Sequence, residues 1–327
     1  MHGVKRKQWT QELLKQKKIQ DERKIAVYRD LTSKALKSRD QCCYTPESLK
    51  DTTRLLQANP EFNAIWNYRR EILIHLKTAL DEEFWDSELM FTLAQLKMFP
   101  KVYWIWNHRL WTLENHSKSS VKVWERELAM VSKLLQLDAR NFHGWHYRRL
   151  ILDKIEKFTG CNRDKEELKF VTENINKNIS NYSAWHQRTV LIPRLFANKQ
   201  ISDEKEFMRK EFAYITNAIF TDAEDQSVWF YINWFIKNEM VLSALEREEY
   251  INLLQDLEKN IRVINQDDLE FSGKQNNWCL KILIVIEKVQ REMGLTIESH
   301  TNEYLKQLIE ADPLRKNRYV SLGEEMS

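Results

Sequence analysis

Apolar residues follow a helical period over long stretches of the chain, and regular breaks interrupt this pattern. Between positions 83 and 98, broadly helical spacing is seen at Phe84, Leu89, Leu93 and Leu96. The pattern breaks at Phe99-Pro100, and an earlier break lies at Asn59-Pro60. Each proline stands six residues before a tryptophan, where it can open a helix or a turn. In later copies the segments 138–140, 178–180 and 221–223 replace it and supply residues that can cap a helix.

A tryptophan-centred segment recurs five times along the chain. Its tryptophans are Trp66, Trp106, Trp145, Trp185 and Trp229, spaced by 40, 39, 40 and 44 residues. An arginine follows three residues later in four copies, at Arg69, Arg109, Arg148 and Arg188. Ile232 replaces it in the fifth copy, and a weaker sixth copy is centred on Trp278. Repeats of this length are typical of solenoids, so we predict an all-α fold, a right-handed α-α superhelix of helical hairpins.

The Trp-x-x-Arg motif is interpreted as structural. A tryptophan near the start of each second helix fills the space between helical pairs, and its indole N–H needs one hydrogen-bond partner. The arginine lies one turn later on the same face, where it can stack on the ring or fork to backbone carbonyls or carboxylates. We therefore expect these residues to build the fold rather than to carry chemistry.

The composition supports a helical chain. Its 327 residues include only six glycines and five prolines, which helices avoid and turn-rich sheet folds need. We predict a single helical-repeat domain over 1–327. It comprises a basic N-terminal arm at 1–45, five clear repeats at 46–240 and degenerate repeats at 241–327.

Positive charge is concentrated at the N-terminus. Residues 1–40 hold twelve Lys/Arg and five acids, a net charge of +7, which leaves −4 for the other residues of this +3 chain. Such an arm can bind an acidic protein, a nucleic acid or an acidic membrane surface. The alternative, which we favour because acids interrupt the basic run, is a solvated helix that docks on the array. Its apolar stripe would comprise Leu13, Leu14, Ile25, Tyr28, Leu31 and Ala35.

The cysteine pattern indicates a reduced, cytoplasmic protein. The four cysteines Cys42, Cys43, Cys161 and Cys279 show no zinc-type pairing. The N-terminus, Met-His-Gly followed by charged residues, does not read as a signal peptide. The longest apolar run, 282–286, is too short to cross a bilayer, so we expect no transmembrane segment.

These residues carry a resemblance to a known family. Trp-x-x-Arg at forty-residue spacing, with Pro100-Lys101-x-Tyr103-x-x-Trp106 in one copy, is similar to the repeat of protein prenyltransferase α subunits. Three segments resemble the Rab geranylgeranyltransferase (type II) chains more than the farnesyl/type I α chain. They are the Met-His-Gly start, 181–193 and 225–231.

The resemblance implies an enzyme subunit that works with a separate β subunit. In such a heterodimer the β subunit is an α-α barrel that holds zinc and the lipid pocket, and magnesium is a further expected ion. The implied reaction transfers geranylgeranyl from geranylgeranyl diphosphate to C-terminal cysteines of Rab GTPases presented by a Rab escort protein. Nucleic acid is not expected as a ligand. Two alternatives stay open: a farnesyl/type I α subunit, and a non-enzymatic scaffold that binds an acidic protein or RNA.

The residue five positions before each tryptophan differs between the repeats, and this variation points to candidate functional residues. It reads Glu61, Lys101, Arg140, Ser180 and Glu224. Equivalent loops should line one edge of a solenoid, which would place Lys101 beside Arg140 and next to helix N-termini that favour anions. A cation there can stabilise charge that builds on a leaving diphosphate. In the family the lysine of Pro-Lys-x-Tyr has this role, which the resemblance carries to Lys101. The alternative is an ordinary solvated loop lysine.

Four further residues complete the candidate set. Tyr103 can donate a hydrogen bond to the same diphosphate or pack between hairpins. His143 matches a family position near the acceptor peptide, whereas Phe142 lacks the hydroxyl that farnesyl-type chains have there. His143 and His146 form an i, i+3 pair without a further ligand nearby, so we expect packing or partner contact. In type II enzymes a Met-His-Gly start suggests that His2 reaches the β-subunit zinc as a reversible fourth ligand.

Overall fold

The computed structural model describes residues 10–116 and 120–326, and every regular element in these ranges is helical. Contacts divide the chain into two compact units. The first comprises Met1–Ser132 with His143–Phe158, and the second comprises Lys133–Phe142 with Thr159–Ser327. The boundary passes through α6 (Val121–Leu137) and α7 (Phe142–Thr159), and each unit is described by itself.

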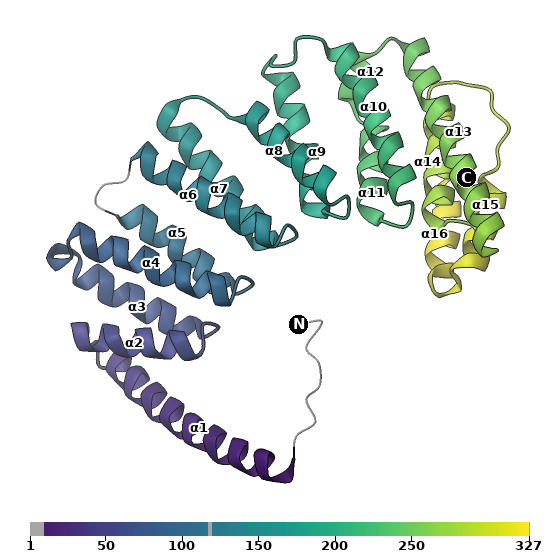
Figure 1. The fold of residues 1–327 in the computed structure, drawn as a ribbon. Coiled ribbons are helices and arrows are strands. Elements are labelled where there is room, and N and C mark those ends of the chain that lie inside the picture. The colour runs from purple at the N-terminus through teal and green to yellow at the C-terminus, as the bar shows by residue number, and fades with distance from the viewer. Residues whose placement is uncertain (1–9, 117–119, 327) are drawn as a thin grey trace. The chain divides into compact units, whose positions relative to one another are not determined.

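The first unit is a stack of helical hairpins. Its elements are α1 (Gln11–Asp40), α2 (Pro46–Ala58), α3 (Asn63–His75), the 3-10 helix η1 (Lys77–Ala79), α4 (Glu82–Met98), α5 (Tyr103–Asn115), and most of α6 and α7. In Figure 1 the pairs α2/α3 and α4/α5 lie side by side, and both pairs are in direct contact within themselves. Each repeat thus consists of one hairpin, as its length predicts.

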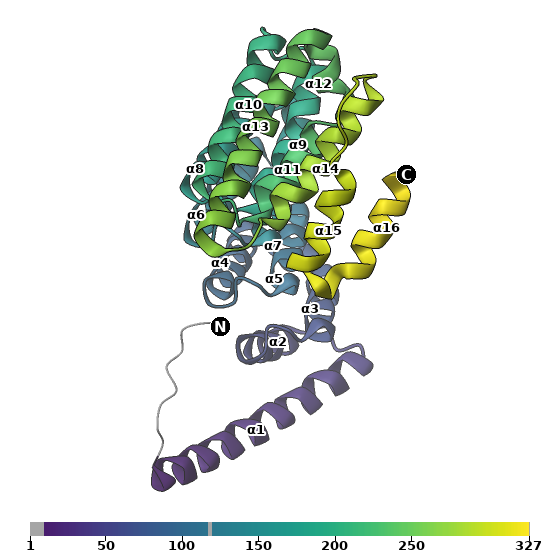
Figure 2. The ribbon, with the colours of Figure 1, turned by 90° about the vertical axis from the view of Figure 1, so that its right-hand side faces the viewer.

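The second unit continues with the same construction. Its elements are α8 (Asp164–Lys177), α9 (Tyr182–Ala197), α10 (Glu204–Thr221), α11 (Gln226–Phe235), α12 (Glu239–Ala244), α13 (Arg247–Ser272), α14 (Asn277–Glu292), α15 (Thr301–Ala311), η2 (Pro313–Arg315) and α16 (Lys316–Met326). Figure 2 shows α14, α15 and α16 in succession at the C-terminal end. Here α15 packs on both α14 and α16.

The predicted breaks between helices are confirmed, and of the two roles predicted for the prolines, the turn is the one found. α4 ends at Met98 and α5 begins only at Tyr103, so Pro100 lies in the turn and does not open the helix. Two of the residues expected as helix caps, Asn178 and Asp222, cap the C-terminal ends of α8 and α10, and their side chains also close the turn that follows. Asn178 Oδ1 accepts from Ser180 N (3.1 Å) and Asp222 Oδ1 accepts from Glu224 N (3.1 Å). The N-caps of the next helices lie three residues further on, at Asn181 and Asp225.

The repeat tryptophans form the centre of the core. Trp66, Trp145, Trp185 and Trp229 are at most 1% exposed, and Trp106 is 3% exposed. Each side chain is a large, stiff volume that successive helices must enclose, and it recurs because every hairpin has the same gap to fill. The structural interpretation of the tryptophans agrees with this burial.

The N-terminal helix packs on its unit only near its C-terminal end. Ala35 is buried, and Tyr28 Oη accepts a hydrogen bond from Asn59 Nδ2 (2.9 Å). Leu13, Leu14 and Ile25 are 47–49% exposed. The expectation that the whole apolar stripe docks is therefore wrong for its first half, because α1 diverges from α2 and α3 before those residues can reach them (Figure 1).

Two other sequence-based expectations bear on the described residues. None of the helices in 10–116 and 120–326 is long and apolar enough to cross a membrane. All four cysteines are free thiols, and burial raises the pKa of Cys279 well above its ordinary value.

Candidate functional site

The indoles of Trp66, Trp106, Trp185 and Trp229 hold the loop in front of their helices. Trp106 Nε1 donates to the carbonyl oxygen of Pro100 at 2.9 Å, six residues earlier. The same bond joins Trp66 to Pro60 (2.8 Å), Trp185 to Ile179 (2.8 Å) and Trp229 to Ala223 (2.9 Å). The residue after each carbonyl is the variable one. The invariant tryptophan therefore fixes the backbone beside Lys101 and its equivalents.

Three motif arginines, Arg69, Arg109 and Arg188, each make a buried ion pair with the following hairpin. Arg109 Nε and Nη2 donate to the two carboxylate oxygens of Glu127 on α6, at 2.6 and 2.7 Å. Arg69 forms the same forked pair with Glu88 on α4, at 2.7 and 2.5 Å. In the second unit Arg188 forks to Glu211 on α10. Such planar, two-bond pairs fix both distance and orientation between neighbouring hairpins.

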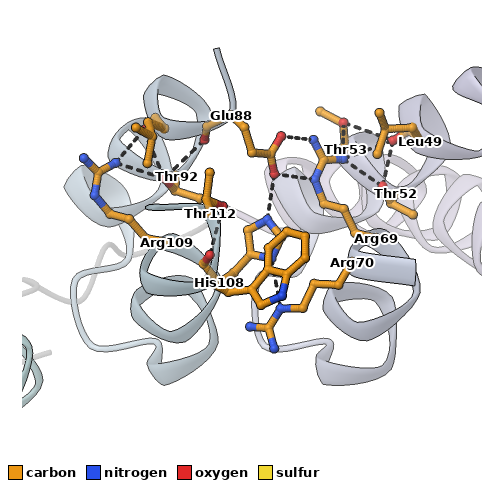
Figure 3. Close-up of polar contacts among 12 residues, drawn as sticks. Leu49, Thr52, Thr53, Arg69, Arg70, Glu88, Thr92, His108, Arg109 and Thr112 are labelled. Atoms are coloured by element: carbon orange, nitrogen blue, oxygen red, sulfur yellow. Dashed lines mark hydrogen bonds and ion pairs between the residues drawn. The ribbon is translucent and has the colours of Figure 1, made fainter. Parts of the chain in front are cut away.

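The remaining guanidinium nitrogen ties the arginine to its own hairpin. Arg69 Nη1 donates to Thr52 Oγ1 at 2.8 Å, and Arg109 Nη1 donates to Thr92 Oγ1 at 3.0 Å. Figure 3 shows Arg69 between the hydroxyls of Thr52 and Thr53 and the Glu88 carboxylate. Each of the three guanidinium nitrogens of Arg69 and Arg109 thus has a hydrogen-bond partner, which favours burial of the cation. Of the two predicted arrangements, stacking or forking, Arg69 and Arg109 fork to a carboxylate and also bond a backbone carbonyl.

Sequence reasoning missed the acidic and hydroxyl partners. The glutamates follow their arginines by 19, 18 and 23 residues, an uneven spacing that hides them among other charges. The hydroxyl residues carry a clearer signal, because they recur every forty residues. They are Thr52, Thr92, Ser132 and Thr172, which bond Arg69, Arg109, Arg148 and Arg188.

A third side chain from the next hairpin completes each cluster. It stands two residues after the tryptophan: His108 Nε2 bonds Glu88 at 2.7 Å, and Tyr147 Oη donates to Glu127 at 2.6 Å. Tyr231 does the same for Glu211 at 2.5 Å. Burial raises the pKa of both tyrosines, which stay neutral donors. We call the Arg–Glu pairs with these third members the polar ladder.

In the third position of the ladder, His108 is a histidine where the other two clusters have a tyrosine. Its Nδ1 accepts from Arg70 Nε at 3.3 Å, so Nε2 carries the proton donated to Glu88 (Figure 3). Burial lowers the pKa of His108 to about 4, against the attraction of Glu88 and with the repulsion of Arg69 and Arg70. Burial also disfavours the Glu88 carboxylate, yet Arg69 and His108 hold its pKa far below the ordinary value.

Lys101, Tyr103 and His143 gather at one edge of the first unit. Lys101 is exposed in the turn before α5, and Tyr103 begins α5 with 45% of its surface exposed. The rings of Tyr103 and His143 lie 5.9 Å apart, centroid to centroid. His143 also hydrogen-bonds to the backbone of Lys101. We call these three residues the loop edge.

The loop edge has an electrostatic setting of its own. Burial lowers the pKa of His143 and the charge of His146 adds to this, while the Lys101 backbone and the carboxylate of Glu61 act in the opposite direction. A half-buried, neutral imidazole thus lies beside an exposed ammonium and a phenol. This set can bind an anion and donate hydrogen bonds to it.

The other predicted site residues are placed as follows. Arg140 is exposed in the turn before α7, and it belongs to the second unit, so its pairing with Lys101 stays a prediction. Phe142 is 64% exposed at the start of α7. His2 lies outside the described residues.

Metal ligands do not gather in the described part of the chain. In residues 10–116 and 120–326, no group of three or more His, Cys, Asp or Glu is arranged to hold a metal ion. The described side chains therefore offer no such ligand set for a resident metal ion.

Comparison with known proteins decides the family. Residues 46–76, 85–116, 124–155, 164–195 and 208–239 match the protein prenyltransferase alpha subunit repeat. Over 325 residues the chain is 58% identical to the geranylgeranyl transferase type-2 subunit alpha of Saccharomyces cerevisiae, with 99% of both chains covered. The chain belongs to the geranylgeranyl transferase type-2 α-subunit family. The Schizosaccharomyces pombe member is 37% identical over 348 residues, with 100% of this chain and 99% of that one covered.

A solved structure supports the fold of this chain. The structure of Candida albicans protein geranylgeranyltransferase-I complexed with GGPP contains a similar chain, with a TM-score of 0.62 and 22% identity. The match covers 92% of this chain and 91% of that chain. The predicted all-α helical-repeat superhelix and the resemblance to type II chains are both confirmed.

Proposed function

We propose that this chain is the α subunit of a cytoplasmic, heterodimeric geranylgeranyl transferase. Its partner is a prenyltransferase β subunit, and the substrates are geranylgeranyl diphosphate and the C-terminal cysteines of Rab GTPases presented by an escort protein. Membership of the type-2 α-subunit family supports this proposal, since full-length relatives carry that name. The farnesyl/type I alternative has no comparable support.

The loop edge is the observation that carries the proposed role in the reaction. Transfer of a prenyl group to a thiolate breaks a carbon–oxygen bond, and negative charge builds on the leaving diphosphate. A cation fixed beside that charge stabilises the transition state more than the ground state. Lys101 is suited to this task because Trp106 holds the carbonyl just before it, which limits the motion of the loop backbone.

Tyr103 and His143 have supporting roles in this proposal. Tyr103 donates its phenolic proton to a diphosphate oxygen, and its 45% exposure leaves the hydroxyl accessible. His143 contacts the acceptor peptide beside the reacting centre, and Arg140 adds a second cation for the diphosphate. The electrostatic interaction of such exposed groups with an anion becomes stronger when a partner subunit excludes water from the edge.

The zinc belongs to the β subunit in this proposal. A zinc ion supplies a thiolate nucleophile by coordinating the acceptor cysteine. Magnesium would serve as a counter-ion of the diphosphate. His2 would reach the β-subunit zinc as a reversible ligand, which an Ala substitution at position 2 tests through the zinc coordination of the resting heterodimer.

Co-expression with candidate β subunits tests the proposed function. We expect a stable heterodimer with a type-2 β subunit that transfers geranylgeranyl to Rab GTPases only when escort protein is present. Escort-independent transfer to short C-terminal peptides, obtained with a type I β subunit instead, would assign the chain to the other class. A monodisperse monomer that joins no β subunit would favour the scaffold alternative.

A further inference from the structure

A groove of about 1130 Å³ lies in the second unit, far along the chain from the loop edge. Its floor is α14, and its walls are the α11 segment with α12 on one side and η2 with α16 on the other. Five basic residues from three of these segments line it: Lys237, Lys281, Lys288, Arg315 and Arg318. Glu292 is the one acidic residue in the described lining. The groove therefore carries a clear excess of positive charge.

Most of these cations form no ion pair with a described side chain. Arg315 pairs with Asp312 at 2.6 Å. Among the side chains that the structure describes, the other four basic residues form no ion pair. Lys281 lies instead over two aromatic faces, 4.4 Å from the ring centroid of Trp278 and 5.5 Å from that of Tyr319. These contacts hold its ammonium in the groove.

The cations are also crowded. Burial lowers the pKa of Lys281, and the neighbouring Arg315 and Arg318 lower it further, against Asp312. Burial and Lys288 act in the same direction on Lys237, against Glu292. An anion bound in the groove would relieve both effects, because it favours the charged form of each lysine.

Apolar surface lies between the charges. One face of α14 carries Lys281, Val285 and Lys288, which are spaced i, i+4 and i+7. The two lysines are therefore about 10 Å apart along the helix axis. Phe230 and Leu242 on the facing wall are 47% and 40% exposed. The groove thus offers a cationic and an apolar strip together.

These features favour one class of ligand. A bilayer surface is flat and would not fill a concave groove. Single-stranded RNA needs a row of free aromatic faces for its bases, whereas Lys281 already lies over the rings of Trp278 and Tyr319. An amphipathic helix in a groove matches both strips, since its apolar residues recur at i, i+3 and i+4 and its acids occupy the flanks. We propose that the groove binds an acidic, amphipathic segment of a partner protein, with its carboxylates on Lys237, Lys281 and Lys288 and its apolar face on Phe230 and Val285.

Charge reversal with a synthetic probe tests this assignment. The probe is a fluorescent 21-residue peptide that presents leucine on one helical face and glutamate on the other, with a glutamine version as its neutral counterpart. We expect the acidic peptide to bind the full chain, and Lys281→Glu with Lys288→Glu to weaken it by about tenfold or more. The control is Lys169→Glu with Lys259→Glu, two exposed lysines of the same unit that form no ion pair. It should leave the affinity unchanged.

Photo-crosslinking identifies a natural occupant. A benzoyl-phenylalanine at position 242, on the rim of the groove, is introduced into the assembled heterodimer with escort protein present, and the captured segment is sequenced. We expect a segment rich in Asp and Glu with apolar residues at helical spacing. If a subunit of the complex already covers the groove, this capture appears while the synthetic peptide does not bind.

Several results would overturn the assignment. These are equal binding of the glutamate and glutamine peptides, capture of a neutral or basic segment, or neither peptide binding nor capture. Tighter binding of phosphatidylserine vesicles or an RNA oligonucleotide, abolished by the same reversal, would assign the groove to another class of ligand. The readouts need no prenyl substrate, and the peptide assay runs on the chain alone if no β subunit joins it. The inference therefore fails or holds separately from the proposed function.

Discussion

The polar ladder and the loop edge occupy adjacent positions of the same repeat, yet the ladder residues are nearly uniform between repeats and the loop residues vary. In the ladder, Arg69, Arg109 and Arg188 repeat one geometry, with a forked glutamate and a hydroxyl. At the loop edge, the position of Lys101, five residues before the tryptophan, is an acid, a base or a serine in the different repeats. A buried charge must have every partner in place, whereas water satisfies any residue in an exposed turn. Uniformity therefore marks residues that build the array, and variation marks residues that are free to acquire a function.

The tryptophan connects the two regions. Its ring is buried with the ladder, but its N–H reaches the carbonyl that precedes the variable residue. The same side chain thus belongs to the core and positions the loop. Substitutions that affect one of these roles and spare the other test the difference between the two regions.

The largest effect is expected from breaking the polar ladder. Arg109→Ala leaves Glu127 buried without its counter-ion, and removal of one partner of a buried pair costs about 3–5 kcal/mol. We expect a loss of unfolding free energy in that range by chemical denaturation at fixed protein concentration. Arg126→Ala, an exposed arginine one residue from Glu127, should change it by less than about 0.5 kcal/mol.

The double variant Arg109→Met with Glu127→Leu sharpens this test. It removes both charges, so much of the lost stability should return, as Ile232 suggests for the fifth repeat. If Arg109→Ala were as mild as Arg126→Ala, the ladder would not hold the hairpins together.

The next effect concerns the pH dependence of stability. Histidine in the unfolded chain takes up a proton near pH 6.5, whereas folded His108 does so only near pH 4. Between these values the unfolded state binds more protons, so stability falls as the pH decreases, by about 3 kcal/mol in total from this group. The depressed pKa of Glu88 adds a further loss below its ordinary value of 4.5.

His108→Gln isolates the first of these contributions. The fourth repeat carries Gln187 at this position, and a glutamine can donate to Glu88 and accept from Arg70 as His108 does. We expect similar stability at pH 7.5 and a flatter decline between pH 6.5 and 4, measured by denaturant titrations at each pH. An unchanged slope would show that His108 does not stay neutral in the fold.

A smaller effect is expected from Trp106→Phe. It removes the hydrogen bond to Pro100 and should cost about 1–2 kcal/mol, with slower transfer because the Lys101 loop loses its anchor. The matched control is Trp185→Phe, which loses the same bond beside Ser180. We expect a similar loss of stability there without slower transfer. Equal slowing in both variants would mean that the loop is not positioned through its tryptophan.

Much of the fold could be predicted from the sequence. The tryptophan spacing located the hairpins, and the prolines marked the ends of α2 and α4, because these residue types have strong local preferences. The glutamates of the ladder could not be recognised, since a charged helical residue reads the same whether it is buried or solvated. Likewise, the apolar stripe of α1 did not reveal that Leu13 and Leu14 stay exposed, because docking depends on the direction in which a helix leaves the array.

The candidate site was less accessible to such reasoning. An exposed loop lysine has no local signature of function, so Lys101 was identified through the family resemblance. The forty-residue register nevertheless predicted that residues from different repeats share an edge, and Tyr103 and His143 do meet there. The basic groove was not predicted, because its cations come from degenerate repeats without a common register.

The single-turnover rate of Lys101→Ala tests the central claim most directly. In the assembled heterodimer, with Lys97→Ala on the last turn of α4 as the matched control, geranylgeranyl transfer is followed from bound geranylgeranyl diphosphate. We predict a rate about 100-fold or more below that of the control, with heterodimer assembly and melting temperature unchanged in both. A Lys101→Ala rate equal to that of Lys97→Ala would contradict the account.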